Sequence, residues 1–216
     1  MFGLKPETAT LVGASAAIGI PLIANFFKEL WFDRRKRKEE RAYISVQLLF
    51  ILDKFTGDCA EVSWDRGFDE SGPEPDGPEY LEIQTEPPVF DMSTVKGEYK
   101  YLEPSLIYRL QSIDIELLKV KQELREVTDN PNFGEEFMDK YILLRRELYA
   151  DVGLKVAQLS DDIRIELKID IDHGWSPKES LIRSKAHIGR IKSRGALLRM
   201  ERKAAYTMRI KQHVPF

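Results

Sequence analysis

Hydrophobic and polar positions repeat at helical spacing along most of this chain, but the first block is almost uniformly apolar. Residues 8–27 carry no charge between Glu7 and Lys28, and about 20 apolar residues form a helix long enough to cross a hydrocarbon core of roughly 30 Å. An aromatic residue and a basic run follow directly, as is typical of a membrane–water interface. The pattern predicts a transmembrane helix with its interface over residues 8–32. The interface residues are Trp31, Arg34, Arg35, Lys36, Arg37 and Lys38.

The charges around this block also predict its orientation. Basic residues beside a span stay preferentially in the cytoplasm, and only Lys5 precedes the apolar run. We therefore expect a single-pass protein of the cell membrane, with residues 1–7 as a short head outside and the C-terminus in the cytoplasm. A secretory signal peptide would carry its charges ahead of the apolar run. A buried helix of a soluble domain is the stronger alternative, because the many Ala, Gly, Ser and Thr residues make the run only mildly apolar.

Small residues recur every four positions inside the predicted span, at Ala9, Gly13 and Ala17. Such a stripe lets two membrane helices approach closely, which favours a homo-oligomer through the membrane helix. Small residues are also common in membrane helices generally, so both interpretations stay open at this point.

After the basic run, the helix continues or restarts after a short break near Asp33. The next segment, residues 39–62, has one apolar face, and its uncharged run, Ala42–Leu52, is too short to span a bilayer. It is better suited to a helix packed into a soluble core. The residues of that face are Ile44, Leu48, Ile51, Phe55, Cys59 and Val62.

Two long amphipathic helices are predicted farther along, separated by a turn at Asp129–Asn132. The first begins at Pro104 and has a heptad seam: Leu106, Leu110, Ile113, Leu117, Val120, Leu124 and Val127. The second begins near Phe133 and ends around Gly174. Its stripe is Phe137, Tyr141, Leu144, Leu148, Val152, Val156, Leu159 and Ile163. The short turn makes the two helices antiparallel neighbours, and the segment 39–62 can close a three-helix bundle with them.

Between the first core helix and Pro104 lies a long acidic loop, residues 63–103, rich in Pro and Gly, which exclude helix for most of it. Leu81, Ile83 and Thr85 alternate with polar residues as in a short strand, which Val89 and Phe90 could pair with. We expect one or two short extended pieces in a mobile loop.

These elements predict an all-α protein. Its parts are a single transmembrane helix, a cytoplasmic antiparallel helical bundle over residues 33–175 and a basic amphipathic tail over residues 176–216, capped by Ser176 and Pro177. The net charge of −3 hides a strong partition. Residues 1–38 carry seven Lys/Arg against three Asp/Glu, residues 178–216 carry eleven against two, and the body between them is acidic.

The basic tail has three interpretations. It could bind anionic headgroups of the cytoplasmic leaflet, which we favour because the anchor holds it near that membrane. It could instead fold onto the acidic bundle or remain a solvated arm. A nucleic-acid partner is not expected, since base-reading motifs are missing and aromatic residues are few. The candidates for anionic-surface binding are Arg190, Lys192, Arg194, Arg199, Arg202 and Lys203.

Residues with catalytic spacing are scarce. The sequence has no Gly-rich phosphate loop and no pair of cysteines, and Cys59 lies on an apolar face, as a small core residue would. Asp170, Asp172 and His173 are the residue types that ligate divalent cations, but a solvated helix end explains them as well. We expect no cofactor and no metal. The sequence predicts a membrane-anchored interaction protein, a scaffold or regulatory subunit with an unidentified protein partner. The alternative is a metal-dependent sensor or enzyme that uses this cluster and the acidic loop.

Overall fold

Four α-helices and one short 3-10 helix make up the secondary structure of the described residues. In chain order they are α1 (Pro6–Trp64), η2 (Tyr99–Tyr101), α2 (Pro104–Thr128), α3 (Phe137–Leu167) and α4 (Pro177–Gln212). The part of the chain that the structure describes contains no strand, which confirms the all-α prediction. The computed structural model describes residues 6–68, 72, 81–129, 137–170 and 176–212, with side chains described from residue 28 to residue 203 of these ranges.

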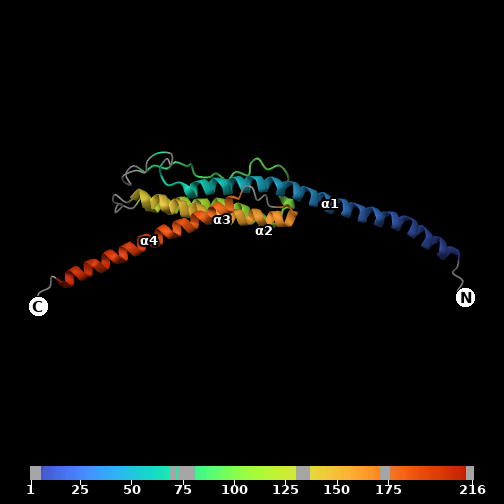
Figure 1. Ribbon diagram of the computed structural model, residues 1–216. Coiled ribbons are helices and arrows are strands. Elements are labelled where there is room, and N and C mark those ends of the chain that lie inside the picture. Colours follow the sequence, from blue (N-terminus) through green and yellow to red (C-terminus); the bar gives the residue numbers. More distant parts are fainter. Residues whose placement is uncertain (1–5, 69–71, 73–80, 130–136, 171–175, 213–216) are drawn as a thin grey trace.

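Helix α3 is the centre of the bundle and packs against α1, α2 and α4 (Figure 1). The predicted heptad seam of α2 is confirmed. Five of its seven residues are buried, and Leu117 also packs against the core. Helix α2 begins with Pro104 at its first turn, where a missing N–H costs no hydrogen bond. It ends at Thr128, and the Asp129 N–H donates to the carbonyl of Arg125 over 2.8 Å.

The buried face of α3 is wider than the predicted stripe. Its second half follows the prediction, with Val152, Val156, Leu159 and Ile163 buried. In its first half the predicted residues Tyr141, Leu144 and Leu148 only flank the core. The residues buried there, which the prediction missed, are Ile142, Arg145, Arg146, Tyr149 and Ala150. Because three neighbouring helices surround α3, more than one stripe of it is covered.

Gly153 of α3 lies where α1 and α4 both pack closely against it. A Cβ atom placed there would lie 2.7 Å from the Cβ of Cys59 on α1 and 2.8 Å from Cδ1 of Leu181 on α4. Cys59 and Leu181 are both fully buried. The absence of a side chain at position 153 therefore lets α1 and α4 pack on the same point of α3.

The predicted three-helix bundle was incomplete, because α4 also belongs to the core. Leu181, Ser184 and Ile188 on its first turns are buried, and α4 packs against both α1 and α3. The predicted cap is present, with Ser176 Oγ accepting a hydrogen bond from the N–H of Glu179 over 3.4 Å. Basic composition concealed this contact, since only every third or fourth residue of α4 faces the core.

Helix α3 ends earlier than predicted. Lys168 adopts a positive φ of 57°, and the N–H of Ile169 donates to the carbonyl of Arg164 over 3.0 Å. This is a left-handed C-terminal cap, formed here by a lysine instead of the glycine that usually occupies this position. Gly174, at which the stop was predicted, lies outside the described residues.

The predicted hairpin at Leu81–Phe90 is wrong. Over residues 81–98 the chain is irregular, and three of its backbone N–H groups donate to residues directly after α1 instead of to a neighbouring strand. The N–H groups of Gln84 and Thr85 both donate to Oδ2 of Asp65 over 3.1 Å. The N–H of Glu82 donates to the carbonyl of Gly67 over 2.8 Å. The buried carboxylate of Asp65 therefore accepts backbone hydrogen bonds that a partner strand would accept in a hairpin.

Helix α1 shows no break near Asp33 and runs on beyond the bundle (Figure 1). Within the part of the chain that the structure describes, no helix is both long and apolar enough to cross a membrane. The predicted span of residues 8–27 lies outside the residues whose side chains are described, and so does the stripe of Ala9, Gly13 and Ala17.

Candidate functional site

The outer part of α1 contains the predicted interface residues, and all of them are exposed. Every residue from Lys28 to Glu39 is exposed, and burial begins only as α1 enters the bundle. Trp31 and Phe32 are 58% and 52% exposed, and their rings meet edge to face at 5.5 Å. The guanidinium of Arg35 lies 5.8 Å from the Trp31 ring and pairs with Glu39 at 2.8 Å. The structure thus brings the aromatic and basic residues together on one exposed helix.

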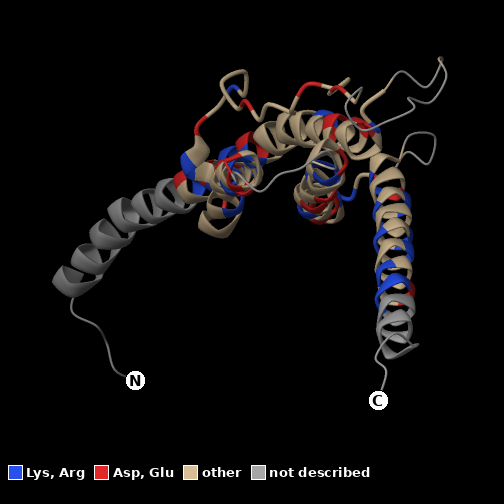
Figure 2. Ribbon diagram, turned by 90° about the vertical axis from the view of Figure 1, so that its left-hand side faces the viewer, with Lys and Arg blue, Asp and Glu red and all other residues tan. Residues whose placement is uncertain are grey.

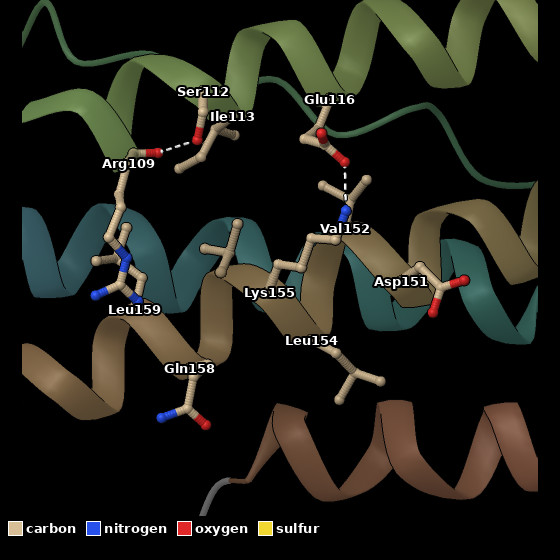
Figure 3. A pocket seen from close by; sticks show the side chains of 11 residues that line it. Arg109, Ser112, Ile113, Glu116, Asp151, Val152, Leu154, Lys155, Gln158 and Leu159 are labelled. Carbon is tan, nitrogen blue, oxygen red and sulfur yellow. Dashed lines mark hydrogen bonds and ion pairs between the residues drawn. The ribbon is translucent and has the colours of Figure 1, made fainter. Parts of the chain in front are cut away.

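A groove of about 530 Å³ lies between α2 and α3 (Figure 3). Its apolar lining includes Ile113 of α2 and Val152, Leu154 and Leu159 of α3. Glu116 of α2 reaches across it to Lys155 of α3, where the charged atoms lie 2.5 Å apart (Figure 3).

The polar rim of this α2–α3 groove is already paired within the bundle. Arg109 forms an ion pair with Asp162 at 2.7 Å. Hydrogen bonds from Lys119 and Lys155 hold the pKa of Glu116 below its usual range, so this carboxylate stays ionised. A groove with an apolar lining and neutralised charges can accept an apolar side chain, but it offers no free acid, base or nucleophile to a substrate.

A second groove, of about 810 Å³, lies between α1 and the start of α4. We call it the α1–α4 groove. Its lining includes two exposed apolar side chains, Phe50 of α1 and Ile182 of α4, which are 72% and 51% exposed. Its polar lining is mainly acidic: Asp53, Asp58, Glu61, Asp161 and Glu179, against Lys54, Arg164 and Lys178.

Part of this acidic lining is neutralised within the molecule. Arg164 pairs with Asp53, and Lys178 pairs with Asp161 at 2.5 Å. Asp58, Glu61 and Glu179 have no ion pair among the described residues. The α1–α4 groove therefore combines exposed apolar side chains with a surplus of negative charge, because Lys54 is its only lining cation without an ion pair among the described residues.

Comparison with protein-family models, curated proteins and solved structures finds no match for this chain. The function must therefore be inferred from the chemistry of its own surfaces.

Sequence reasoning missed a buried ionic cluster where α1 ends. Arg145 and Asp65 are 2% and 6% exposed, and their charged atoms lie 2.9 Å apart. Arg145 also donates to the carbonyl of Thr85, and the N–H of Gly67 donates to Oδ1 of Asp65 over 2.9 Å. The cluster anchors the loop at residues 81–86 to the bundle. Every polar group in it is satisfied, so it is structural and not a reactive site.

The neighbouring Arg146 ties the end of α1 to α4. Its Nε donates to the carbonyl of Ser63 over 2.9 Å, and that carbonyl also accepts from Oγ of Ser184 over 2.7 Å. His187 of α4 stacks on Trp64 with ring centroids 5.7 Å apart. Burial lowers the pKa of His187, and the nearby arginines lower it further. The imidazole is therefore neutral at physiological pH.

The predicted metal candidates do not come together in the described residues. Asp170 is exposed after the end of α3, whereas Asp172 and His173 lie outside the described residues. Over the described ranges, no three His, Cys, Asp or Glu side chains are close enough to hold a metal ion. Cys59 is buried as expected, and burial raises the pKa of its thiol, so it is not an ionised nucleophile.

The predicted anionic-surface residues lie on the outer part of α4, which we call the arm and define as residues 190–203. Lys and Arg residues recur along this part of α4 (Figure 2), and Glu201 is the only acidic residue of the arm. All six predicted residues are exposed, but Lys192 already pairs with Glu147 of α3. The arm is thus partly engaged by the bundle at its base and accessible beyond it.

Proposed function

We propose that this chain is a membrane-anchored interaction protein whose helical bundle is presented to partners in the cytoplasm. The observation that carries the proposal is the arrangement along α1: an uncharged block at residues 8–27, the exposed aromatic pair Trp31–Phe32 and the basic run 34–38 on one continuous helix. Interfacial aromatics and cytoplasmic cations flank membrane spans in this order.

The shape of α1 supports the proposal as well. The bundle covers α1 only from about Ile44 onward, and the exposed segment ahead of it continues the same helix. A helix that leaves its bundle gains little stability from tertiary contacts. Insertion of the apolar block into a bilayer would supply the missing stabilisation, because apolar side chains and an internally bonded backbone are what lipid favours.

An interaction role fits the chemistry of the bundle better than catalysis does. The groove of Figure 3 has an apolar lining with paired charges, and the α1–α4 groove has exposed apolar walls with acids around them. Both features suit contact with another helix. We also include self-association through the span, at the stripe of Ala9, Gly13 and Ala17, in the proposal.

Extraction of cell membranes with alkaline carbonate tests the anchor. The wild-type chain should stay with the membrane pellet, whereas Ile18→Arg combined with Leu22→Arg should move it to the supernatant, because each charge at mid-span costs about 2.5–3.5 kcal/mol. Phe50→Arg is the matched control, since it adds a charge to an exposed position on the bundle. Recovery of the wild-type chain in the supernatant would contradict the proposal.

A further inference from the structure

Helix α4 packs against the bundle through positions at steps of three and four, and this spacing continues beyond the bundle. Its buried residues Leu181, Ser184 and Ile188 step by three and four. The same steps continue to Ile191, Gly195 and Leu198 on the arm, where Ile191 and Leu198 are 39% and 47% exposed. The apolar seam of α4 therefore extends into solvent without a partner helix among the described residues.

A row of cations follows this seam at intervals of seven residues. Lys178, Lys185 and Lys192 pair with carboxylates of α3, namely Asp161, Asp151 and Glu147. The next member of the row is Arg199, which has no ion pair in the described part of the chain, and neither has Arg202 beside it. The apolar seam and the row of cations by which α4 binds the acidic face of α3 thus both continue on the arm. There they have no helix of the same molecule to contact among the described residues.

The α1–α4 groove has the complementary features. Phe50 and Ile182 are exposed apolar walls, and Asp58 and Glu61 are acids of α1 without an ion pair among the described residues. Arm and groove cannot meet within one molecule, because both α4 segments belong to one continuous helix. At a rise of 1.5 Å per residue, Leu198 lies about 24 Å along the axis from Ile182.

We propose that the arm of one molecule docks in the α1–α4 groove of a second copy. Ile191 and Leu198 face Phe50 and Ile182, and Arg199 and Arg202 face Asp58 and Glu61. If each arm enters the other molecule's groove, the two contacts are equivalent and the assembly closes as a two-fold dimer. The interface uses only the bundle and α4, so it does not depend on the membrane anchor.

Anionic lipid headgroups are the alternative binding partner of the arm, and the structure favours a helix instead. A helix lying on a membrane separates a broad apolar face from its cations. Here Arg194 and Arg199 flank a narrow seam, and Arg202 follows Leu198 at its end. Leu197 and Met200 are exposed away from the seam, and residues 190–203 contain no aromatic residue. A seam flanked by charges is the arrangement by which helices select partner helices.

Charge reversal and its rescue test the contact. Full-length protein in detergent is analysed by sedimentation, in a Gly13→Ile background that removes any association through the span stripe. Arg199→Glu with Arg202→Glu should weaken the dimer roughly tenfold or more, since like charges then face each other. Asp58→Lys with Glu61→Lys should restore it when combined with the arm variant. Ser193→Glu with Met200→Glu, away from the seam, is the control and should leave the dimer intact.

Site-specific crosslinking tests the geometry separately. Two differently tagged chains, one with Phe50→Cys and one with Leu198→Cys, should form a mixed dimer with a short bismaleimide. Met200→Cys in place of Leu198→Cys should not, because the two positions point about 160° apart around the helix.

Four results would overturn the proposal: a monomeric Gly13→Ile protein with arm and groove unchanged, a dimer insensitive to the charge reversal, a failed rescue, or equal crosslinking from positions 198 and 200. If that Gly13→Ile protein is monomeric and binds vesicles of phosphatidylcholine with phosphatidylglycerol through Arg199 and Arg202, the arm binds the lipid surface. Carbonate extraction reports on the anchor alone, so failure of the dimer leaves that proposal standing.

Discussion

At the scale of single residues, two arginines next to each other in α3 organise the junction of α1, α3 and the acidic loop. Arg145 neutralises Asp65, which in turn receives the backbone N–H groups of Gln84 and Thr85. Arg146 instead reaches the carbonyl of Ser63. Two adjacent cations in an amphipathic stretch suggest a solvated edge, and the periodicity alone could not reveal that both are buried. Their partners are about 80 residues earlier in the chain.

Arg145→Met should destabilise the protein strongly, because it leaves the carboxylate of Asp65 buried without its cation. Removal of one partner of a buried pair costs about 3–5 kcal/mol. Guanidinium unfolding of the full chain in detergent, followed by circular dichroism, measures the loss. Asp65→Asn added to Arg145→Met should recover part of it, since the unpaired charge disappears. A single variant as stable as wild type would show that water reaches the pair.

His187 should make stability fall as the pH drops below about 6.5, the ordinary histidine pKa. Its folded pKa is lowered by burial and then by Arg146, Arg190 and Arg66. The unfolded chain therefore binds the proton more readily, and stability is retained above this window and lost below it. The melting temperature of wild type should fall more between pH 7.5 and pH 5.5 than that of His187→Gln. His173→Gln is the control, and equal pH dependence in His187→Gln and wild type would contradict the account.

At the scale of the elements, the buried face of α2 could be predicted from the sequence better than that of α4. The seven-residue seam of α2 could be predicted from its spacing, because one face of it meets the bundle and the rest faces water. The start of α4 has the same spacing, but lysines and arginines dominate its composition and conceal the buried Leu181 and Ile188. Three of these lysines also contribute to the contact, since they pair with acids of α3.

Gly153 should be intolerant of a side chain, whereas Gly189 on α4 should accept one. A Cβ at Gly153 would lie closer to Cys59 and Leu181 than packed atoms allow, but none of the surrounding atoms is within 4 Å at Gly189. Gly153→Ala should therefore lower the free energy of unfolding by about 1–3 kcal/mol, even though alanine favours the helix. Gly189→Ala should raise it by up to about 1 kcal/mol. Thermal unfolding of both variants measures the contrast, and an equally stabilised Gly153→Ala would refute the close three-helix packing.

At the scale of the whole molecule, α1 and α4 both continue beyond the bundle as helices, and each has an exposed segment with its own chemistry (Figures 1 and 2). The exposed segment of α1 combines aromatic and basic residues next to the apolar block. The arm of α4 is basic and has only a narrow apolar seam. We interpret the first as the boundary of a membrane anchor and the second as a contact to another copy.

The topology of this arrangement is the central claim and can be measured directly. Single cysteines are introduced at Glu7, in the predicted outer head, and at Thr94, an exposed position beside the bundle. Cys59 is buried and serves as the internal control, since wild type should not react before unfolding. The protein is then treated in intact cells with a membrane-impermeant thiol reagent. We expect labelling at position 7 and none at position 94 until the cells are lysed, because in the proposed topology the basic run Arg34–Lys38 favours a cytoplasmic bundle. Labelling at position 94 in intact cells would contradict the account.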